Sequence, residues 1–511
     1  MEMKLRELLQ GCDYPENFRD EDSLPDIDIS GVAYDSRKVK EGVLFVAIAG
    51  EKCDGHDFIA DALKRGAVAI IGERELRSPN PLYIRVKDSR KTLACIAHNF
   101  FGMPSNSLTL IGVTGTNGKT TTTYILKSIL ETWGKKVGLI GTIQYMIQDR
   151  VYPALYTTPE SLEFHDLLKD MLLSGCTHVI SEVSSHALSQ YRVDKAIFHT
   201  AVFTNLTRDH LDFHKTMGNY FRAKERLFIE LLDKDGTAVV NLDDPYGKGL
   251  VSSLGTRHTS QKILTYGLEA GADIMARNID NLSWGLKFKM SFRNEEYDIS
   301  SHLMGLPNVY NILSAVGASI SLGVPWQVIL EGLKKVNNVT GRFEKVDIGQ
   351  GFLCIIDYAH TEDALERLIH TAKELVTRYP ALSAQHSLPR IITVFGCGGD
   401  RDRGKRPKMG EVATRLSDFV IITSDNPRSE EPSDIIKEIE SGAVNKNYLM
   451  EPDRREAIRK AVGMAGVADI VLIAGKGHEN YQEVKGVRHR FNDREVLEEV
   501  IKDRLRMQNV V

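Results

Sequence analysis

The chain has 511 residues, of which 42% are hydrophobic and 26% are charged, and this composition excludes a fibrous or disordered protein. Its 65 basic and 69 acidic residues leave a net charge of −4. A nearly neutral chain has no overall field to hold a polyanion, so a role in coating nucleic acid is disfavoured and any anionic ligand must be held by local groups. The six cysteines are scattered without a C-x-x-C pair, so we expect neither a zinc ribbon nor a disulfide framework.

The N-terminal segment, residues 1–10, alternates charged and apolar residues and lacks the apolar core of a signal peptide. No apolar run approaches the roughly 18 residues that span a bilayer. We therefore expect a cytoplasmic protein that is not inserted in a membrane, in a compartment that keeps thiols reduced.

Short apolar runs separated by helix-length segments recur along the whole chain. In chain order, the runs expected to form strands are 43–47, 67–71, 108–113, 137–140, 178–183, 198–203, 353–356, 390–395, 418–423 and 469–474. This alternation predicts an α/β fold with mostly parallel sheets, because parallel strands need crossover helices. The polar stretch 381–388 is expected to be an exposed loop.

Two changes of pattern divide the chain. Turn-forming residues at 104–107 precede the third apolar run, and the strand–helix rhythm restarts near Thr340. We therefore predict three domains, residues 1–106, 107–338 and 339–511, in line with a prior of about 150 residues per domain.

A glycine-rich segment, GVTGTNGKTT at residues 112–121, follows a predicted strand and opens a predicted helix. Glycines let several backbone N–H groups point into one concavity, and the helix N-terminus adds positive partial charge there. The candidate phosphate-binding residues are Gly115, Thr116, Asn117, Gly118, Lys119, Thr120 and Thr121. Lys119 would neutralise the outer phosphates, and the Thr120 hydroxyl would ligate Mg²⁺. The chain has no N-K-x-D element, which argues against a guanine-reading GTPase.

Three further side chains are candidates for the same site. Glu182 ends a predicted strand and is the best carboxylate for Mg²⁺, the alternative being a solvent-facing glutamate. His210 and His214 are four residues apart, but Leu211 stands where a zinc protease needs glutamate, so a core or surface histidine pair stays open. The spacing of Lys224 by itself indicates only an ordinary solvated helix lysine.

The segments 115–121, 182–188, 204–214, 308–311, 341–344 and 357–360 together span most of the chain. In these segments the chain resembles the Mur ligases, the ATP-dependent enzymes that extend the stem peptide of peptidoglycan. The resemblance implies an N-terminal domain for a uridine-nucleotide substrate, a central P-loop ATPase-like domain with a mostly parallel sheet, and a C-terminal Rossmann-like domain. It also implies two chemical steps: ATP phosphorylates a substrate carboxylate, and an amino group then attacks the acyl phosphate.

The resemblance also implies roles for residues of the central and last domains. The implied catalytic residues are Lys119, Glu182, His210 and Lys224. The implied Mg²⁺ ligands are Thr120, Glu182, His210 and Lys224, the lysine as a carbamate, which converts a cation into an anion. Besides the phosphate loop, the residues that match family positions at ATP are Asn308, Asn311, Arg342 and Asp357.

Other segments resemble the members of this family that add meso-2,6-diaminopimelate to UDP-N-acetylmuramoyl-L-alanyl-D-glutamate. The implied contacts to the UDP-dipeptide are Ser36, Thr157, Thr158, Ser184, Gln190 and Arg192. The implied contacts to diaminopimelate are Arg401, Asp425, Asn426, Pro427, Arg428, Gly475 and Glu479. A guanidinium fork at Arg428 suits the carboxylate that diaminopimelate has and lysine lacks, and Glu479 can receive the distal ammonium. The resemblance thus implies a ligase of this specificity that uses ATP and Mg²⁺, and we expect a monomer.

The chain departs from the family pattern at Pro307, Thr340 and Glu362, and none of these positions removes a functional group named above. Two alternatives stay open. One is another ligase of the superfamily, such as a folate polyglutamylating enzyme, against which the residues around Ser36 and the set 425–428 argue. The other is a scaffold of the wall-synthesis machinery that binds the nucleotide without turning it over.

Overall fold

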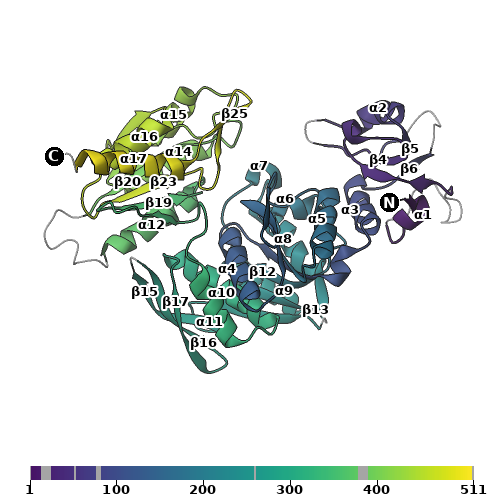
Figure 1. Ribbon diagram of the computed structural model, residues 1–511, viewed down its shortest axis with the longest axis horizontal. Helices are drawn as coiled ribbons and strands as arrows, with labels where there is room; N and C mark the ends of the chain where they lie inside the picture. The colour runs from purple at the N-terminus through teal and green to yellow at the C-terminus, as the bar shows by residue number, and fades with distance from the viewer. Residues whose placement is uncertain are drawn as a thin grey trace.

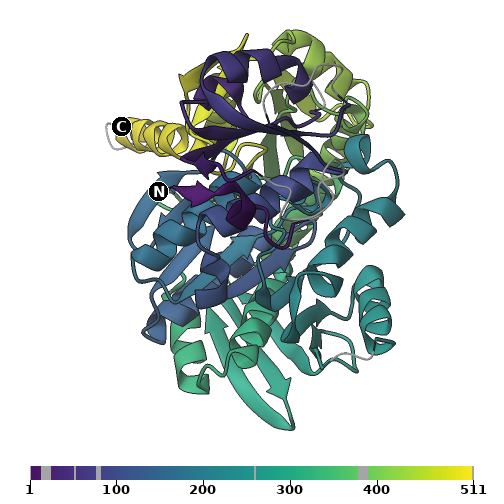
Figure 2. The same ribbon diagram turned by 90° about the vertical axis from the view of Figure 1, so that its right-hand side faces the viewer.

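The structure is a computed structural model that describes residues 2–12, 25–50, 53–75, 82–257, 260–282, 284–377 and 389–508. The chain forms successive α/β units, each built on a sheet of its own (Figure 1). The first and last units lie on the same side of the central unit, and Figure 2 shows the first unit in front of the last. The predicted α/β class is confirmed, while the loop expected at 381–388 lies outside the described residues.

The first unit is a four-stranded parallel sheet in the order β3-β4-β5-β6. Its elements are β1 (Met3–Lys4), α1 (Leu5–Leu8), β2 (Asp28–Ile29), β3 (Gly31–Ala33), the 3₁₀ helix η2 (Ser36–Lys38), β4 (Val43–Val46), η3 (Gly55–Phe58), α2 (Ile59–Lys64), β5 (Ala67–Gly72), β6 (Leu82–Arg85), α3 (Ser89–Phe100) and η4 (Pro104–Ser107). Strand β4 is buried on both faces, as its unbroken apolar run predicts.

Cys12 and Cys95 form a disulfide in this unit, so the expectation of no disulfide is wrong for this pair. They are separated by 83 positions in sequence, and the packing of α1 on α3 brings their Cα atoms to 5.5 Å. Spacing along the chain could not show this pairing, because the contact depends on two helices that are far apart in sequence.

The central unit is an 11-stranded sheet in the order β10-β9-β8-β11-β7-β12-β13-β14-β15-β16-β17. Its strands are β7 (Thr109–Thr114), β8 (Val137–Ile140), β9 (Gln144–Ile147), β10 (Arg150–Pro153), β11 (His178–Glu182), β12 (Phe198–Phe203), β13 (Leu232–Asn241), β14 (Lys262–Gly267), β15 (Ile274–Leu282), β16 (Gly285–Phe292) and β17 (Glu295–Ser301). In sheet order, neighbouring strands from β8 through β11, β7, β12, β13 and β14 to β15 pair in parallel. Antiparallel strands extend both edges: β9 and β10 beyond β8, and β16 and β17 beyond β15. The antiparallel edges were not predicted.

Helices cover both faces of this sheet. They are α4 (Lys119–Thr132), α5 (Ser161–Leu173), α6 (Ser185–Ser189), α7 (Leu211–His214), α8 (Met217–Ile229), α9 (Pro245–Gly255), α10 (Leu306–Ser321) and α11 (Trp326–Lys335). On β7, Ile111 faces the core under α4, α10 and α11, and its neighbour Leu110 faces the core under α5, α8 and α9. This alternation follows from the two-residue period of a strand.

The last unit is a six-stranded sheet in the order β18-β19-β23-β20-β21-β22, parallel except for β18. Its elements are β18 (Glu344–Val346), β19 (Leu353–Asp357), α12 (Glu362–Thr377), β20 (Ile391–Phe395), α14 (Lys405–Leu416), β21 (Phe419–Thr423), α15 (Pro432–Glu440), β22 (Tyr448–Glu451), α16 (Arg454–Met464), β23 (Ile470–Ala474), the hairpin β24 (Tyr481–Val484) and β25 (Val487–Arg490), and α17 (Asp493–Gln508). No helix in the described parts of the chain is long and apolar enough to cross a membrane.

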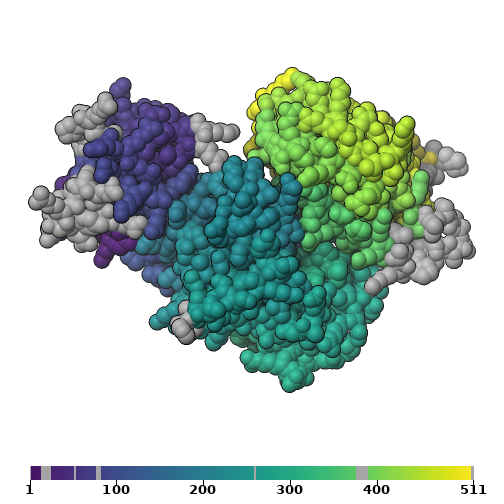
Figure 3. Space-filling model, turned by 180° about the vertical axis from the view of Figure 1, so that it is seen from behind, coloured from purple at the N-terminus to yellow at the C-terminus, as the bar shows by residue number. Residues whose placement is uncertain are grey.

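The arrangement of the units leaves a hollow between the first and the last, with the central unit as its floor (Figure 3). The phosphate loop follows β7, Glu182 ends β11, and the segments 424–428 and 475–479 follow β21 and β23. All four therefore lie at the carboxyl ends of parallel strands, where α/β sheets bind ligands.

A buried ion pair holds two of these strand ends together. Arg454 and Asp493 are both buried, and Nε and Nη2 of the arginine each donate to a carboxylate oxygen at 2.8 Å. The same guanidinium donates to the carbonyls of Ser424 (3.3 Å) and Ala474 (3.0 Å) at the ends of β21 and β23. It thus fixes the separation of the two loops that follow.

We predict that Arg454→Ala lowers the free energy of unfolding of the last unit by about 3–5 kcal/mol, because Asp493 is left buried and unpaired. The matched control is Arg455→Ala, which removes an exposed pair with Glu499 (2.7 Å) and should cost about 0–1 kcal/mol. Urea unfolding of both variants measures the difference. Equal losses would contradict a special role for the buried pair.

Candidate active site

The phosphate loop joins β7 to α4 and packs closely against two other segments. Gly115 (φ +144°) and Gly118 (φ +87°) have positive φ. A Cβ atom at Gly115 would collide with Oγ1 of Thr204, and one at Gly118 would collide with Oδ1 of Asn311. Glycine is therefore required at both positions by space as well as by backbone conformation.

Lys119 is the first residue of α4, and its side chain folds back over the loop. Nζ donates to the carbonyls of Gly115 (3.0 Å) and Thr116 (2.8 Å). Burial lowers the pKa of Lys119, and the nearby Glu182 carboxylate opposes that shift. A phosphate group in the loop would give this ammonium a stronger partner than two carbonyls.

Glu182 lies beside the phosphate loop, as its place at a strand end suggested. Parallel pairing of β11 with β7 sets Glu182 opposite Val113, and the carboxylate is fully buried. It accepts from Thr120 Oγ1 at 3.1 Å and from both N and Oγ1 of Thr142 at 2.9 Å. The alternative of a solvent-facing glutamate is therefore wrong.

Lys224 of α8 is also buried, so its interpretation as a solvated helix lysine is wrong. Its Nζ donates to the Gly115 carbonyl at 2.8 Å and lies 4.6 Å from the centre of the Tyr220 ring. Burial first, and the charge of Lys119 second, hold the pKa of Lys224 well below its usual value. Burial and a neighbouring positive charge both favour the neutral amine over the ammonium.

The two histidines of the i, i+4 pair have different surroundings. His210 caps α7 with φ +53°, and its Nε2 lies 3.4 Å from the Asp209 carboxylate at the wall of a large cavity. The Nε2 atom of His214 is 2.9 Å from the Ser185 hydroxyl, and burial lowers the pKa of His214 to about 4. His214 is thus a satisfied packing residue, and only His210 is open to a ligand.

The oxygen donors at this loop fit Mg²⁺ better than a transition metal. Within the described residues, no group of three or more His, Cys, Asp or Glu side chains could hold a metal ion by itself. Thr120 and Glu182 supply neighbouring oxygens next to the phosphate loop. Mg²⁺ commonly takes one or two protein oxygens and completes its shell with water and phosphates, so this donor set suits it.

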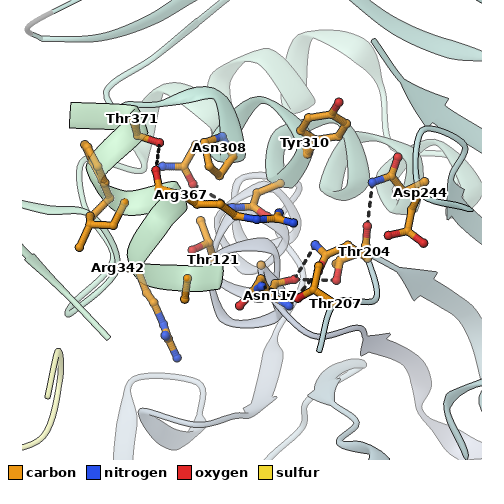
Figure 4. A pocket seen from close by; sticks show the side chains of 18 of the residues that line it. Asn117, Thr121, Thr204, Thr207, Asp244, Asn308, Tyr310, Arg342, Arg367 and Thr371 are labelled. Atoms are coloured by element: carbon orange, nitrogen blue, oxygen red, sulfur yellow. Dashed lines mark hydrogen bonds between the residues drawn. The ribbon is translucent and has the colours of Figure 1, made fainter. Parts of the chain in front are cut away.

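A cavity of about 450 Å³ lies beside the loop, between the central and last units (Figure 4). The predicted nucleotide residues that line it are Asn117, Gly118, Thr121, Asn308, Asn311, Arg342 and Asp357. Asn308 is held by Met304 and by Asn311, at 2.7 and 2.9 Å. Pro307, one of the positions where the chain departs from the family pattern, lies in the first turn of α10, where proline is tolerated.

The last unit supplies part of this cavity. Arg342 Nη2 donates to Thr120 Oγ1 at 3.3 Å. Asp357 accepts from the backbone N–H groups of Phe343 (2.6 Å) and Ala359 (2.8 Å), and burial raises the pKa of Asp357. The cavity that holds the predicted nucleotide residues is therefore complete only when the two units are apposed.

Sequence reasoning missed several residues of this cavity. Tyr310, Asp243, Asp244, Arg367 and Thr371 line it, and Asp363 of α12 accepts from Thr207 Oγ1 (3.0 Å) and from Asn117 Nδ2 (3.4 Å). The only local signal is that Asp244 precedes Pro245, a pattern typical of a helix start. The remaining residues are recognisable only after folding.

A second cavity, of about 850 Å³, also lies between the central and last units. The predicted residues that line it are Thr157, His210, Arg401, Asp425, Asn426, Arg428, Gly475 and Glu479. Arg428 donates from Nη1 to the Gly399 carbonyl at 2.6 Å, and its Nε lies 3.9 Å from Glu483. Pro427 belongs to the same turn.

The residues expected at the UDP-dipeptide fall into two places. Thr158 Oγ1 donates to the Glu182 carbonyl (2.7 Å) and accepts from the Ser184 N–H (3.1 Å). Arg192 donates to the Thr158 carbonyl (3.0 Å) and to Gln190 Oε1 (2.7 Å). Thr157 and Thr142 share a hydroxyl contact of 3.1 Å. Ser36 lies apart from this cluster, on η2 of the first unit, where it hydrogen-bonds Asp61.

Comparison with known proteins gives matches along almost the whole chain. Family models match at residues 28–101 (Mur ligase family, catalytic domain), 113–319 (Mur ligase middle domain) and 341–477 (Mur ligase, glutamate ligase domain). A UDP-N-acetylmuramoyl-L-alanyl-D-glutamate–2,6-diaminopimelate ligase from Caldanaerobacter subterraneus subsp. tengcongensis is 45% identical over 502 residues, which cover 98% of this chain and 99% of that protein.

Comparison with solved structures gives the same family of ligases. The structure of a UDP-N-acetylmuramoyl-L-alanyl-D-glutamate–2,6-diaminopimelate ligase matches with a TM-score of 0.68 and 33% identity over 99% of both chains. MurF ligase from Thermotoga maritima in complex with ADP matches with a TM-score of 0.61 and 22% identity, over 93% of this chain and 98% of that one, which shows a shared fold. With family models over most of its length and a relative of 45% identity along 98% of it, the chain belongs to the Mur ligase family.

Proposed function

We propose that this chain is an ATP-dependent ligase that joins meso-2,6-diaminopimelate to UDP-N-acetylmuramoyl-L-alanyl-D-glutamate, a step of peptidoglycan precursor synthesis. One observation carries the proposal: the same two segments form the wall between the two cavities. Thr207 and Asp357 line the nucleotide cavity, and the residues that follow each of them, Arg208 and Tyr358, line the larger one. A phosphoryl group and an amine bound in the two cavities would meet at this shared wall.

The first step transfers the terminal phosphoryl group of ATP to the carboxylate of the D-glutamyl residue. Lys119, Arg342 and the N-terminus of α4 stabilise the charge on the phosphates. Mg²⁺ would be held by Thr120, Glu182, His210 and carbamylated Lys224, and it would supply further neutralisation of phosphate charge. The products are ADP and an acyl phosphate, which is a better acylating group than the carboxylate.

In the second step, the amino group of diaminopimelate attacks the acyl carbon, the amide bond forms, inorganic phosphate leaves and the amine loses a proton. Arg428 and Arg401 lie at the larger cavity with donors for carboxylates. Glu479 and Asp425, at the same wall, are acceptors for an ammonium group. The UDP-dipeptide would extend from the cluster around Arg192 to Ser36 in the first unit.

The domain division at 106/107 and 338/339 completes the proposal: substrate capture, ATP chemistry and amino-acid delivery belong to one domain each. Because both cavities lie between the last two domains, closure of the last domain would align the amine with the acyl phosphate. We further propose that the enzyme acts as a monomer in the cytoplasm, without membrane insertion and without nucleic acid.

The amino-acid selectivity of the purified enzyme tests the whole proposal. With ATP, Mg²⁺ and the UDP-dipeptide, we expect phosphate release with meso-diaminopimelate and at most a few per cent of that rate with lysine, because lysine leaves the Arg428 guanidinium without a carboxylate. Release with lysine alone would refute the specificity. Turnover stimulated by a folate would favour the polyglutamylating alternative, and ATP binding without release would favour a scaffold.

Arg428→Ala should raise the KM for diaminopimelate by about 10- to 100-fold, the range expected when a charged hydrogen-bond partner is lost. The KM for the UDP-dipeptide should stay unchanged, because its proposed contacts lie on other segments. Arg428→Lys is the matched control: it retains charge without the fork, so its KM should be intermediate. Equal loss of affinity for both substrates would show that Arg428 acts through the fold.

Carbamylation of Lys224 can be observed directly. With ¹³C-bicarbonate, we expect a protein carbamate resonance that is absent from Lys224→Ala and that disappears as pH falls through the lowered pKa of this lysine, because only the neutral amine reacts with CO₂. Lys224→Ala should lose about 100-fold in turnover, and acetate should restore part of it. Lys215→Ala, at an exposed lysine nearby, should show neither effect. A persisting resonance in Lys224→Ala would assign the carbamate elsewhere.

A further inference from the structure

Lys476 is a fully buried lysine that the reaction described above does not use. It lies two residues after β23, with none of its surface exposed to solvent. Its Nζ is 3.0 Å from Glu479 Oε2 and 3.2 Å from Asn426 Oδ1. A buried ammonium without partners is strongly destabilising, so these two contacts account for its presence there.

The two partners also hold each other. Asn426 Nδ2 donates to Glu479 Oε2 at 2.7 Å, and its Oδ1 accepts the Glu483 N–H at 2.9 Å. Since an ammonium group can only donate, Lys476 forces the Asn426 oxygen toward itself and the Asn426 amide nitrogen toward the carboxylate. The three side chains therefore have one arrangement that satisfies all of them.

Asn426 and Glu479 line the larger cavity, and the described lining does not include Lys476, which lies behind them. The two large buried arginines differ in this respect. Arg454 is paired with Asp493, and Arg406 with Glu430 (2.8 Å) and Glu438 (2.7 Å), none of which lines this cavity. Among these cations, Lys476 is the one that hydrogen-bonds side chains lining the proposed amino-acid site.

We propose that Lys476 is a positioning residue for amino-acid selection: it holds Asn426 and Glu479 so that an ionised carboxylate faces the cavity, and the enzyme thereby distinguishes an amino acid with a second ammonium group from one without it. This inference rests on the proposed function, since it assigns Glu479 to the distal ammonium of the substrate. Lys476 itself touches no substrate and acts only through its two partners.

The charges around Glu479 agree with this assignment. Burial raises the pKa of Glu479, and Asp425 raises it further, while Lys476 and the Asn426 amide lower it. The other titratable groups that face it are Tyr358, Tyr481 and Arg454. Without Lys476 the carboxylate would stay protonated to higher pH, and a neutral carboxyl group attracts an ammonium weakly.

The test compares meso-diaminopimelate with 2-aminopimelate, which has the same carbon chain and carboxylates but lacks the second amino group. In Lys476→Met we expect kcat/KM for diaminopimelate to fall about 10- to 100-fold, with the value for 2-aminopimelate nearly unchanged. The KM values for ATP and the UDP-dipeptide should not change. Lys485→Met, at a surface lysine 3.0 Å from Glu431, is the matched control and should behave as wild type.

The pH profile provides a second readout that a purely structural role would not move. Wild-type kcat/KM for diaminopimelate should decline as pH falls through the pKa of Glu479, because the carboxylate becomes protonated. In Lys476→Met the same decline should begin at higher pH. Equal losses for both amino acids with an unshifted profile would overturn the inference.

If Lys476→Met does not fold, Glu479→Gln and Lys476→Arg decide the question. Glu479→Gln keeps the lysine and removes the charge of its partner, so it should lose the preference for diaminopimelate. Lys476→Arg keeps the cation and should therefore retain the preference for diaminopimelate. Retained preference in Glu479→Gln would overturn the inference, as would a wild-type enzyme that turns over both amino acids equally. A wild-type enzyme inactive with diaminopimelate would instead refute the proposed function.

Discussion

The buried carboxylate of Glu182 connects the segments from which the proposed active site is built. Its side chain accepts from Thr120 in the phosphate loop and from Thr142 at the end of β8, and its backbone carbonyl accepts from Thr158. One residue at the end of β11 thus fixes the phosphate loop relative to the cluster proposed to hold the UDP-dipeptide. Movement of this strand end would separate the phosphate donor from the carboxylate that receives it.

The net charge of −4 contrasts with the proposed substrates, all of which carry negative charge. The structure resolves this by concentrating cations locally: Lys119 and Lys224 converge on the Gly115 carbonyl, and Arg428 lies in the larger cavity. Two lysines on one carbonyl repel each other, and a carbamate on Lys224 would remove that repulsion. In the same way, the buried Lys476 lies beside the Glu479 carboxylate at the larger cavity.

Local pattern was sufficient to predict the phosphate loop between β7 and α4 and about half of the strands in the three sheets. The predicted strands are β4, β5, β7, β8, β11, β12, β19, β20, β21 and β23. The position of Glu182 also followed from the sequence, because parallel strands end at a common edge. The burial of Lys224, the disulfide between Cys12 and Cys95, and the antiparallel strands β16 and β17 did not follow. The first two depend on contacts between segments far apart in sequence, which spacing does not encode. Strands β16 and β17 instead pair through short turns with the strand before each, and the search for unbroken apolar runs missed them.

The last unit contributes to both cavities, and this constrains how the two steps can be coupled. Arg342 reaches Thr120, and Asp363 reaches Thr207 and Asn117, so the unit contacts the phosphate loop directly. The segments that follow β21 and β23 belong to the same sheet and are joined to each other by the Arg454–Asp493 pair. We therefore expect the unit to move as one body against the central sheet. The contacts proposed to complete the nucleotide site and those proposed to position the amine would then form together, which would keep the acyl phosphate from water until the amine is in place.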